Sequence, residues 1–224
     1  KIIALHDHSG PGAISKLVQA IGKGKSVAYA SEAGMPLIAD PGFELGRAVL
    51  HAEHQVTSAP GPSAVLTALV LAGLPTDAFF FAGFLPNAKS ARQTALQKLQ
   101  DVPGTLVFYE SPKRLAAFLS DAAGVLGAER QAVVCRELTK KFEETTRGTL
   151  QELAASYVGK SIKGEVVVVV DRGLSEKITT VGLEEELRSA LKTHSMRDAV
   201  DLVANAHEMP RRQVYQLALA LSKE

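Results

Sequence analysis

Loops rich in glycine and proline are the parts of this sequence whose residue types best suit ligand binding. The most prominent is Ser31–Gly42, S-E-A-G-M-P-L-I-A-D-P-G, in which glycines and prolines prevent regular structure from continuing. Gly34 can adopt backbone angles closed to other residues, and Pro36 and Pro41 each fix φ and remove an amide donor. A loop of this kind after a buried strand presents backbone N–H and C=O groups beyond the carboxyl end of an α/β sheet. An isolated loop would be read as an ordinary strand-to-helix connection, but this one has counterparts.

Two further loops have the same character. Ala59–Ala64, A-P-G-P-S-A, places Ser63 as an N-cap ahead of an apolar helix, and the exposed amides of a helix N-terminus suit a carboxylate or phosphate. Glu110–Arg114, E-S-P-K-R, follows another buried-type strand and has a proline where the next helix begins. Because all three loops follow strands and are spread over both halves of the chain, they predict one ligand held in a cleft between two lobes.

The elements that would position these loops alternate between strand and helix. Hydrophobic runs predict strands at 2–5, 25–30, 55–58, 78–82, 105–109, 131–135 and 166–170, with helices between them. A run of three helices is expected at the end of the chain, at 183–192, 196–206 and 211–221. The pattern predicts an α/β protein with an N-terminal lobe at 1–76, a second α/β lobe at 77–174 and a helical appendage at 175–224.

Composition limits the classes of protein that fit. The 224 residues carry a net charge of +1 and are 46% hydrophobic, so a sizeable core is expected and any basic surface must be local. The lone Cys135 lies in an apolar run, which predicts a buried thiol, excludes a disulfide framework and fits a reducing cytoplasm. We expect no metal site and no membrane association, since no apolar run approaches the roughly 20 residues of a membrane span. The phosphate-loop, nucleophile-elbow, zincin and dinucleotide-binding motifs are all absent.

Seven short motifs, taken in order, carry a family resemblance. They are S-E-A-G-M-P-L-I-A-D-P-G, A-P-G-P-S-A, G-L-P-T-D, G-F-L-P, F-Y-E-S-P-K-R, R-E-L-T-K-K-F-E-E and K-G-E-V-V-V-V-V. In this order they closely resemble the bacterial small-subunit ribosomal RNA (cytidine-2′-O)-methyltransferases, which are members of the tetrapyrrole methylase superfamily. The resemblance implies a homodimer that binds S-adenosylmethionine in a cleft between two α/β domains and methylates small-subunit ribosomal RNA.

The sequence departs from that family in two respects. Glu32 and Met35 stand where the family usually has Asp and Thr, which moves one carboxylate by a methylene and removes one hydroxyl donor. The family's opening P-I-G-N strand and its A-E-D-T-R segment are not found. Since the sequence begins at Lys1 and enters an apolar run at once, we expect further residues upstream.

The resemblance also implies the residues of the cofactor site. A carboxylate such as Glu32 or Asp40 would favour the sulfonium and ammonium groups of the cofactor. The cofactor-binding residues expected from the resemblance are Ser31, Glu32, Ala33, Gly34, Pro36, Leu37, Ile38, Asp40, Ser63, Ala64, Tyr109, Glu110, Ser111, Arg136, Glu137, Leu138, Gly164, Glu165 and Val166.

Methyl transfer to a ribose hydroxyl needs positioning and benefits from a base near the methyl group. Glu110 and Glu137 are the candidate catalytic bases, and each could equally be a salt-bridged loop carboxylate. RNA contacts are expected from a local excess of basic residues in 86–148, where ten Lys and Arg face seven Asp and Glu. The expected RNA-binding residues are Lys89, Arg92, Lys113, Arg114, Lys140, Arg211 and Arg212.

Two other functions remain open at this point. The same fold could methylate a carbon of a tetrapyrrole, although the helical appendage and the basic residues argue against it. A non-catalytic relative that binds cofactor or RNA is the other alternative, because Met35 and the missing opening segment put the site in doubt.

Overall fold

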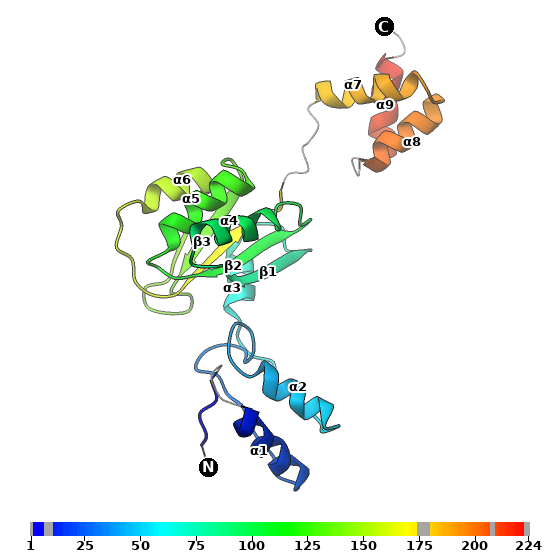
Figure 1. Cartoon of the computed structure of the whole chain (residues 1–224). Coiled ribbons are helices and arrows are strands. Elements are labelled where there is room, and N and C mark those ends of the chain that lie inside the picture. The colour runs from blue at the N-terminus through cyan, green and yellow to red at the C-terminus, as the bar shows by residue number, and fades with distance from the viewer. Residues whose placement is uncertain (1, 7–10, 174–179, 207–208, 222–224) are drawn as a thin grey trace. The chain divides into compact units, whose positions relative to one another are not determined.

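The computed structural model describes residues 2–6, 11–173, 180–206 and 209–221 (Figure 1). The chain forms two compact units, residues 1–173 and 174–224.

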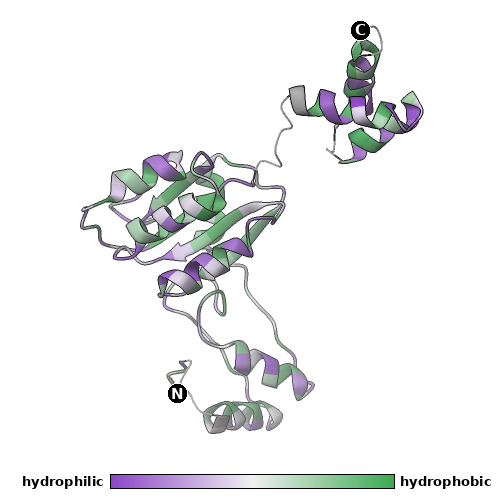
Figure 2. Ribbon diagram, turned by 45° about the horizontal axis from the view of Figure 1, so that its top comes forward, coloured by the Kyte–Doolittle hydropathy of each residue, from purple (hydrophilic) through white to green (hydrophobic). Residues whose placement is uncertain are grey.

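A five-stranded mixed sheet is the centre of the first unit. Its strands are β1 (Phe79–Phe84), β2 (Thr105–Glu110), β3 (Gln131–Arg136), β4 (Glu144–Thr149) and β5 (Val166–Val170), in the order β1-β2-β5-β3-β4. β1 runs parallel to β2, and every other neighbouring pair is antiparallel. β5 consists of five buried valines, as expected for a strand covered on both faces. Figure 2 shows hydrophobic residues concentrated along these strands.

Helices cover both faces of the sheet. Helices α4 (Lys89–Gln97), α5 (Leu115–Leu126) and α6 (Leu150–Tyr157) pack on one face, around Phe108, Phe118 and Leu153 (Figure 1). Helix α3 (Ala64–Ala72) packs on the other face, against Val107, Val133 and the free thiol of Cys135, which is buried as predicted. Although α3 precedes the boundary predicted at residue 76, its apolar face thus belongs to the core of this sheet.

The first sixty residues differ from the expected α/β lobe. They form helices α1 (Pro11–Gly22) and α2 (Phe43–His51), whereas the segments 2–5, 25–30 and 55–58, predicted as strands, are not strands in the structure. Val27 and Val56, expected in buried strands, are 42% and 51% exposed. The physical reason is that a strand requires a hydrogen-bonded neighbour, and none of these segments has a ladder partner within the part of the chain that the structure describes.

The second unit is a three-helix cluster with its own core. Helices α7 (Thr180–Leu191), α8 (Met196–Ala206) and α9 (Arg211–Leu221) agree closely with the three helices predicted from sequence. Leu187, Val203 and Val214 are fully buried among them. In the described ranges, none of the helices has the length and apolar character needed to cross a membrane.

Candidate functional site

The structure brings the first two Gly/Pro loops against each other. Gly34 has a φ of +72°, and a Cβ atom built on it would lie 3.4 Å from the carbonyl oxygen of Pro62. A Cβ atom on Gly61 would lie 3.0 Å from the sulfur of Met35. The hydroxyl of Ser31 donates to the carbonyl of Gly34 at 2.8 Å and so closes the turn. The two loops therefore form one cradle in which glycine permits the close approach of backbone.

Strained backbone marks the second half of the central loop. Leu37 and Ala39 have φ values of +69° and +57°, which non-glycine residues rarely adopt and which cost of order 1–3 kcal/mol each. The end of the loop is fixed because the hydroxyl of Tyr29 donates to the carbonyl of Pro41 at 2.6 Å. This arrangement holds Asp40 between two constrained neighbours.

Asp40 faces the sheet across a cavity. Ala39 and Asp40 line a hollow of about 540 Å³ together with the end of β1, from Phe81 to Phe84. Phe81 and Phe84 each make an edge-to-face contact with Tyr109, at centroid distances of 4.8 and 5.5 Å. Burial raises the pKa of Tyr109, and the charges of Asp40 and Glu165 raise it further, so both carboxylates act on this ring. Sequence reasoning missed Phe81 and Phe84; for Phe84 the available signal was the G-F-L-P motif at the end of a strand.

Glu110 and Arg114 hold the third loop. Glu110 is only 2% exposed, and its carboxylate accepts hydrogen bonds from the amide of Ser111 at 2.7 Å and from Arg114 Nη2 at 3.1 Å. Arg114 also donates to the carbonyl of Leu85 at 2.7 Å and to the side chain of Asn87. Burial raises the pKa of Glu110, which the Ser111 amide and Arg114 oppose. These contacts tie the ends of β1 and β2 together, so Arg114 has a structural role in the third loop, and its expected RNA contact stays a prediction.

Glu137 is the centre of a second loop network. It has a φ of +51°, and its Oε1 accepts from the amide of Glu165 at 3.0 Å and from Lys140 Nζ at 2.9 Å. Lys140 also donates to the carboxylate of Glu165 at 3.0 Å. A Cβ atom on Gly164 would lie 2.5 Å from the Glu137 side chain, so only glycine fits there. Lys140 and the Glu165 amide hold the pKa of Glu137 below its ordinary value.

The neighbouring Arg136 is engaged in the same way. It donates to the carboxylate of Glu144 at 2.8 Å and to the carbonyl of Lys163 at 3.3 Å. The segments 136–138 and 164–166, which the resemblance placed beside the cofactor, are therefore joined by the hydrogen bonds between Glu137 and Glu165.

Arg92 is not part of a basic surface. It is 5% exposed, and its guanidinium donates to the carboxylate of Asp121 at 2.8 Å and to the carbonyl of Asn87 at 3.0 Å. A buried guanidinium that is paired in this way has no face left for phosphates, so the expected RNA contact at Arg92 is wrong. Lys89 and Lys113 are exposed, as predicted.

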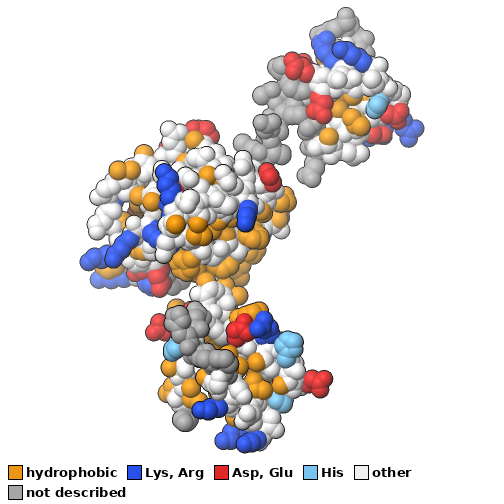
Figure 3. Space-filling model, viewed as in Figure 1, with side chains coloured by type: hydrophobic (Ala, Val, Ile, Leu, Met, Phe, Trp, Pro, Cys, Tyr) orange, Lys and Arg blue, Asp and Glu red, His pale blue; other side chains and the backbone are white. Residues whose placement is uncertain are grey.

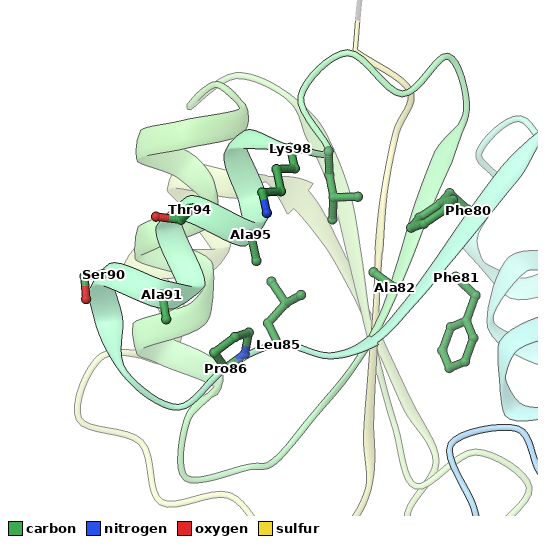
Figure 4. A pocket seen from close by; sticks show the side chains of 11 residues that line it. Phe80, Phe81, Ala82, Leu85, Pro86, Ser90, Ala91, Thr94, Ala95 and Lys98 are labelled. Carbon is green, nitrogen blue, oxygen red and sulfur yellow. The ribbon is translucent and has the colours of Figure 1, made fainter. Parts of the chain in front are cut away.

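A larger hollow lies between β1 and α4 (Figure 4). Its volume is about 620 Å³, and its lining is apolar apart from Ser90, Thr94 and Lys98. It shares Phe81 and Ala82 with the cavity at Asp40 but includes none of the three loops. In the described part of the chain, no three His, Cys, Asp or Glu side chains are grouped so that they could hold a metal ion.

Comparison with known proteins shows which family the chain resembles. Residues 12–154 match the model of the tetrapyrrole (corrin/porphyrin) methylases, and residues 182–222 match an RsmI C-terminal HTH domain. The ribosomal RNA small subunit methyltransferase I of Mycobacterium tuberculosis is 42% identical over the whole chain, which covers 79% of that protein. The enzyme of the same name from Synechocystis is 39% identical over 99% of the chain and 81% of its own length.

The chain belongs to the ribosomal RNA small subunit methyltransferase I family, within the tetrapyrrole methylases. The family expected from the seven ordered motifs is thereby confirmed. Solved structures agree in fold: the methyltransferase CobJ superposes with a TM-score of 0.52 at 17% identity, covering 74% of this chain and 72% of CobJ. Uroporphyrin III C-methyl transferase from Thermus thermophilus superposes with a TM-score of 0.51 at 16% identity, and the match covers 75% of each chain.

Proposed function

We propose that this chain transfers a methyl group from S-adenosylmethionine to the ribose 2′-hydroxyl of a cytidine in small-subunit ribosomal RNA, in the cytoplasm. The observation that carries the proposal is 42% identity, over the entire chain, to a ribosomal RNA small subunit methyltransferase I. A separate match of the helical unit to that family's C-terminal HTH domain supports an RNA substrate over a small tetrapyrrole.

The cofactor residues are those of the cradle and of the loops at the ends of β2, β3 and β5. The cradle suits the cofactor because Gly34, at a φ of +72°, lets the backbones of the two loops lie together with no side chain between them at that position. Exposed Glu32 can offer its carboxylate to a sulfonium or ammonium group. Within the cradle we assign cofactor contacts to Ser31–Pro36, Leu37, Ile38, Ser63 and Ala64. On the sheet side we assign them to Tyr109–Ser111, Arg136–Leu138 and Gly164–Val166.

Glu110 and Glu137 act as positioning residues in this proposal. The carboxylate of Glu110 is buried and engaged by Ser111 and Arg114, and that of Glu137 is engaged by Lys140 and Glu165. A general base must reach the proton that it abstracts, whereas both carboxylates are engaged by partners within the protein. Their contribution is to hold two loops in one geometry, from which methyl transfer gains through orientation.

A cofactor cleft between two lobes and a homodimer are further parts of the proposal. The cleft is supported because the charges of Asp40 on the central loop and of Glu165 on the sheet side both act on Tyr109. The dimer is supported by β1, an edge strand on which Phe79 and Phe80 are 45% and 44% exposed. Figure 3 shows apolar side chains gathered on the β1 side of the sheet. A second copy that covers this edge would bury both the apolar side chains and the unpaired backbone groups.

The test is transfer of labelled methyl from S-adenosylmethionine to purified small ribosomal subunits that lack the modification. The expected product is a single cytidine whose 3′ phosphodiester resists alkaline hydrolysis, because its 2′-oxygen is blocked. Large subunits and uroporphyrinogen serve as control acceptors. Label in the porphyrinoid, or in a base instead of a ribose, would overturn the proposal.

A further inference from the structure

We propose that the cavity between Asp40 and β1 is the pocket for the target cytosine, in which Asp40 accepts a hydrogen bond from the exocyclic amine and Phe84 stacks on the base. The proposal rests on the function proposed above and deepens it, because it names the residues that select the acceptor nucleotide. It also moves Asp40 from the cofactor side of the site to the RNA side.

The composition of the cavity is the first support. Its volume of about 540 Å³ falls in the range of small-ligand sites, and Asp40 is the one charged residue among the lining residues that the structure describes. The rest of the lining is Ala39 and the apolar segment Phe81–Phe84. A single carboxylate against an aromatic wall suits a flat, uncharged group with one strong donor.

The aromatic wall is held in place by β2. Phe84 is 57% exposed, yet its ring contacts Tyr109 edge-to-face at 5.5 Å, so it is an exposed phenyl ring with a fixed neighbour. The pairing of β1 with β2 shifts register between Phe81 and Gly83, and Gly83 has a φ of +63°. Such an irregularity turns the following side chain out of the regular alternation and is frequent beside functional sites. Bases taken out of a stack are commonly held against aromatic side chains in this way.

The carboxylate of Asp40 distinguishes cytosine from uracil in this proposal. Cytosine presents an N4 amine donor where uracil presents an O4 acceptor, and Asp or Glu is the side chain that accepts from that amine. Asp40 is fixed by its strained neighbour Ala39 and by the Tyr29–Pro41 hydrogen bond. A carboxylate in this position favours cytidine and repels uridine without any backbone movement.

The adenine of the cofactor also carries an amine, and the structure favours the RNA base over it. The central loop contributes only Ala39 and Asp40 to the lining of the cavity; its segment Ser31–Ile38 and the loops Ala59–Ala64 and Glu110–Arg114, which carry the other expected cofactor residues, contribute none. The experiment below measures the two ligands separately.

The test compares acceptors that carry cytidine or uridine at the methylated position of reconstituted small subunits. For Asp40→Asn we expect the cytidine-to-uridine ratio of kcat/KM to fall at least about tenfold, because the amide can donate to O4 of uracil. Asp40→Ala should also lose discrimination, with slower transfer to cytidine. Phe84→Leu should weaken both acceptors and leave their ratio unchanged. Glu44→Gln on α2, an exposed carboxylate paired with Arg47, is the matched control.

Calorimetry with S-adenosylmethionine tests the alternative, in which the pocket binds the adenine of the cofactor. We expect the affinity of Asp40→Asn for the cofactor to stay within about twofold of the wild type. A large loss of cofactor affinity would give the pocket to adenine, and an unchanged cytidine-to-uridine ratio would exclude Asp40 as the selecting residue. A wild-type protein that methylates no cytidine would instead overturn the proposed function, and that result involves no Asp40 variant.

Discussion

Burial divides the basic residues of this protein into those that hold the fold and those that face solvent. Arg92 and Arg114 lie in helix-start segments that look like an RNA surface in the sequence, yet both bridge acidic or carbonyl groups inside the sheet unit. Lys89 and Lys113, close to them in sequence, are exposed. Arginine is suited to the first task because its planar guanidinium serves several acceptors at once.

The buried pair of Arg92 and Asp121 leads to a stability prediction. Arg92→Ala should lower the free energy of unfolding by about 3–5 kcal/mol, because it leaves the Asp121 carboxylate buried without its cation. Replacement of both partners by apolar residues, Arg92→Met with Asp121→Leu, should recover much of that loss. Urea denaturation measures both effects, and Lys89→Ala, one turn away and exposed, should stay within about 0.5 kcal/mol of the wild type. An Arg92→Ala protein of wild-type stability with weakened RNA binding would return Arg92 to the RNA surface.

Glu137 leads to a prediction on pH dependence. Lys140 and the Glu165 amide hold its pKa below the ordinary value of 4.5, so the folded state favours the ionised carboxylate. A depressed pKa contributes stability that is present above the unfolded value and is lost as the pH falls through the folded value. The stability advantage of the wild type over Glu137→Gln should therefore be constant at neutral pH and shrink as the pH falls below about 4.5.

The Lys140→Met background tests the cause of that behaviour. Lys140 is the largest source of the lowered pKa of Glu137. In Lys140→Met, the acid-dependent difference between Glu137 and its Gln variant should be much smaller, because the two residues are coupled. Denaturation curves across the acid range provide the measurement. A difference of the same size in both backgrounds would contradict the assignment.

At the scale of elements, the sequence predicted the sheet unit well and the first sixty residues poorly. The runs at 105–109, 131–135 and 166–170 all lie in observed strands, since buried strands read as continuous apolar runs. No strand was predicted at β4 (Glu144–Thr149), because this edge strand is only partly covered and its sequence is polar. The same hydrophobic signal at 25–30 and 55–58 produced no strand, because a strand depends on neighbours that a local pattern does not contain.

The site was predicted in its loops but not in its side-chain contacts. Gly34, Gly61 and Gly164 could be singled out because loops of this kind use glycine for a positive φ or a close approach. A Cβ atom on Gly61 or Gly164 would lie 3.0 Å or less from a side chain of a neighbouring loop. The burial of Arg92 could not be seen, since its helix is polar; the available signal was Asp121 within the apolar helix α5, where a carboxylate needs a cation. The proposed stacking of Phe84 on the base depends on the register shift of β1, which the sequence pattern does not predict.

The cradle leads to a prediction at the element scale. Gly34→Val should weaken S-adenosylmethionine binding at least tenfold, because the new side chain would meet the carbonyl of Pro62 and part the two loops. Gly24→Val is the matched control: Gly24 has a similar φ of +81° but no described atom within 4 Å of its hypothetical Cβ. Both variants carry backbone strain, and only the first disturbs the cradle. Calorimetry that finds equal affinities in the two variants would remove the cradle from the cofactor site.

At the scale of the whole molecule, we expect the sheet unit to bind the cofactor and the helical unit to contribute RNA contacts. The sheet unit contains the loops of the cofactor site, and the helical unit has a core of its own and matches an HTH domain. At the start of α9, Arg211 pairs with Asp201, whereas the neighbouring Arg212 and Tyr215 are exposed. An exposed cation beside an exposed aromatic ring is a combination that binds the backbone and bases of unpaired RNA.

The salt dependence of RNA binding tests which basic residues contact phosphates. Each phosphate contact that is lost should reduce the slope of log affinity against log salt by about 0.7–0.9, because fewer counterions are released. We expect one such step for Arg212→Ala, up to two for Lys89→Ala with Lys113→Ala, and less for Arg211→Ala, which is held by Asp201. Arg47→Ala, whose guanidinium pairs with Glu44 on α2, is the charge-matched control. Cofactor affinity should not change in any of these variants, since none of the residues lies in the cradle. Slopes equal to that of the wild type in both the sheet-unit and the helical-unit variants would place the RNA on another face of the protein.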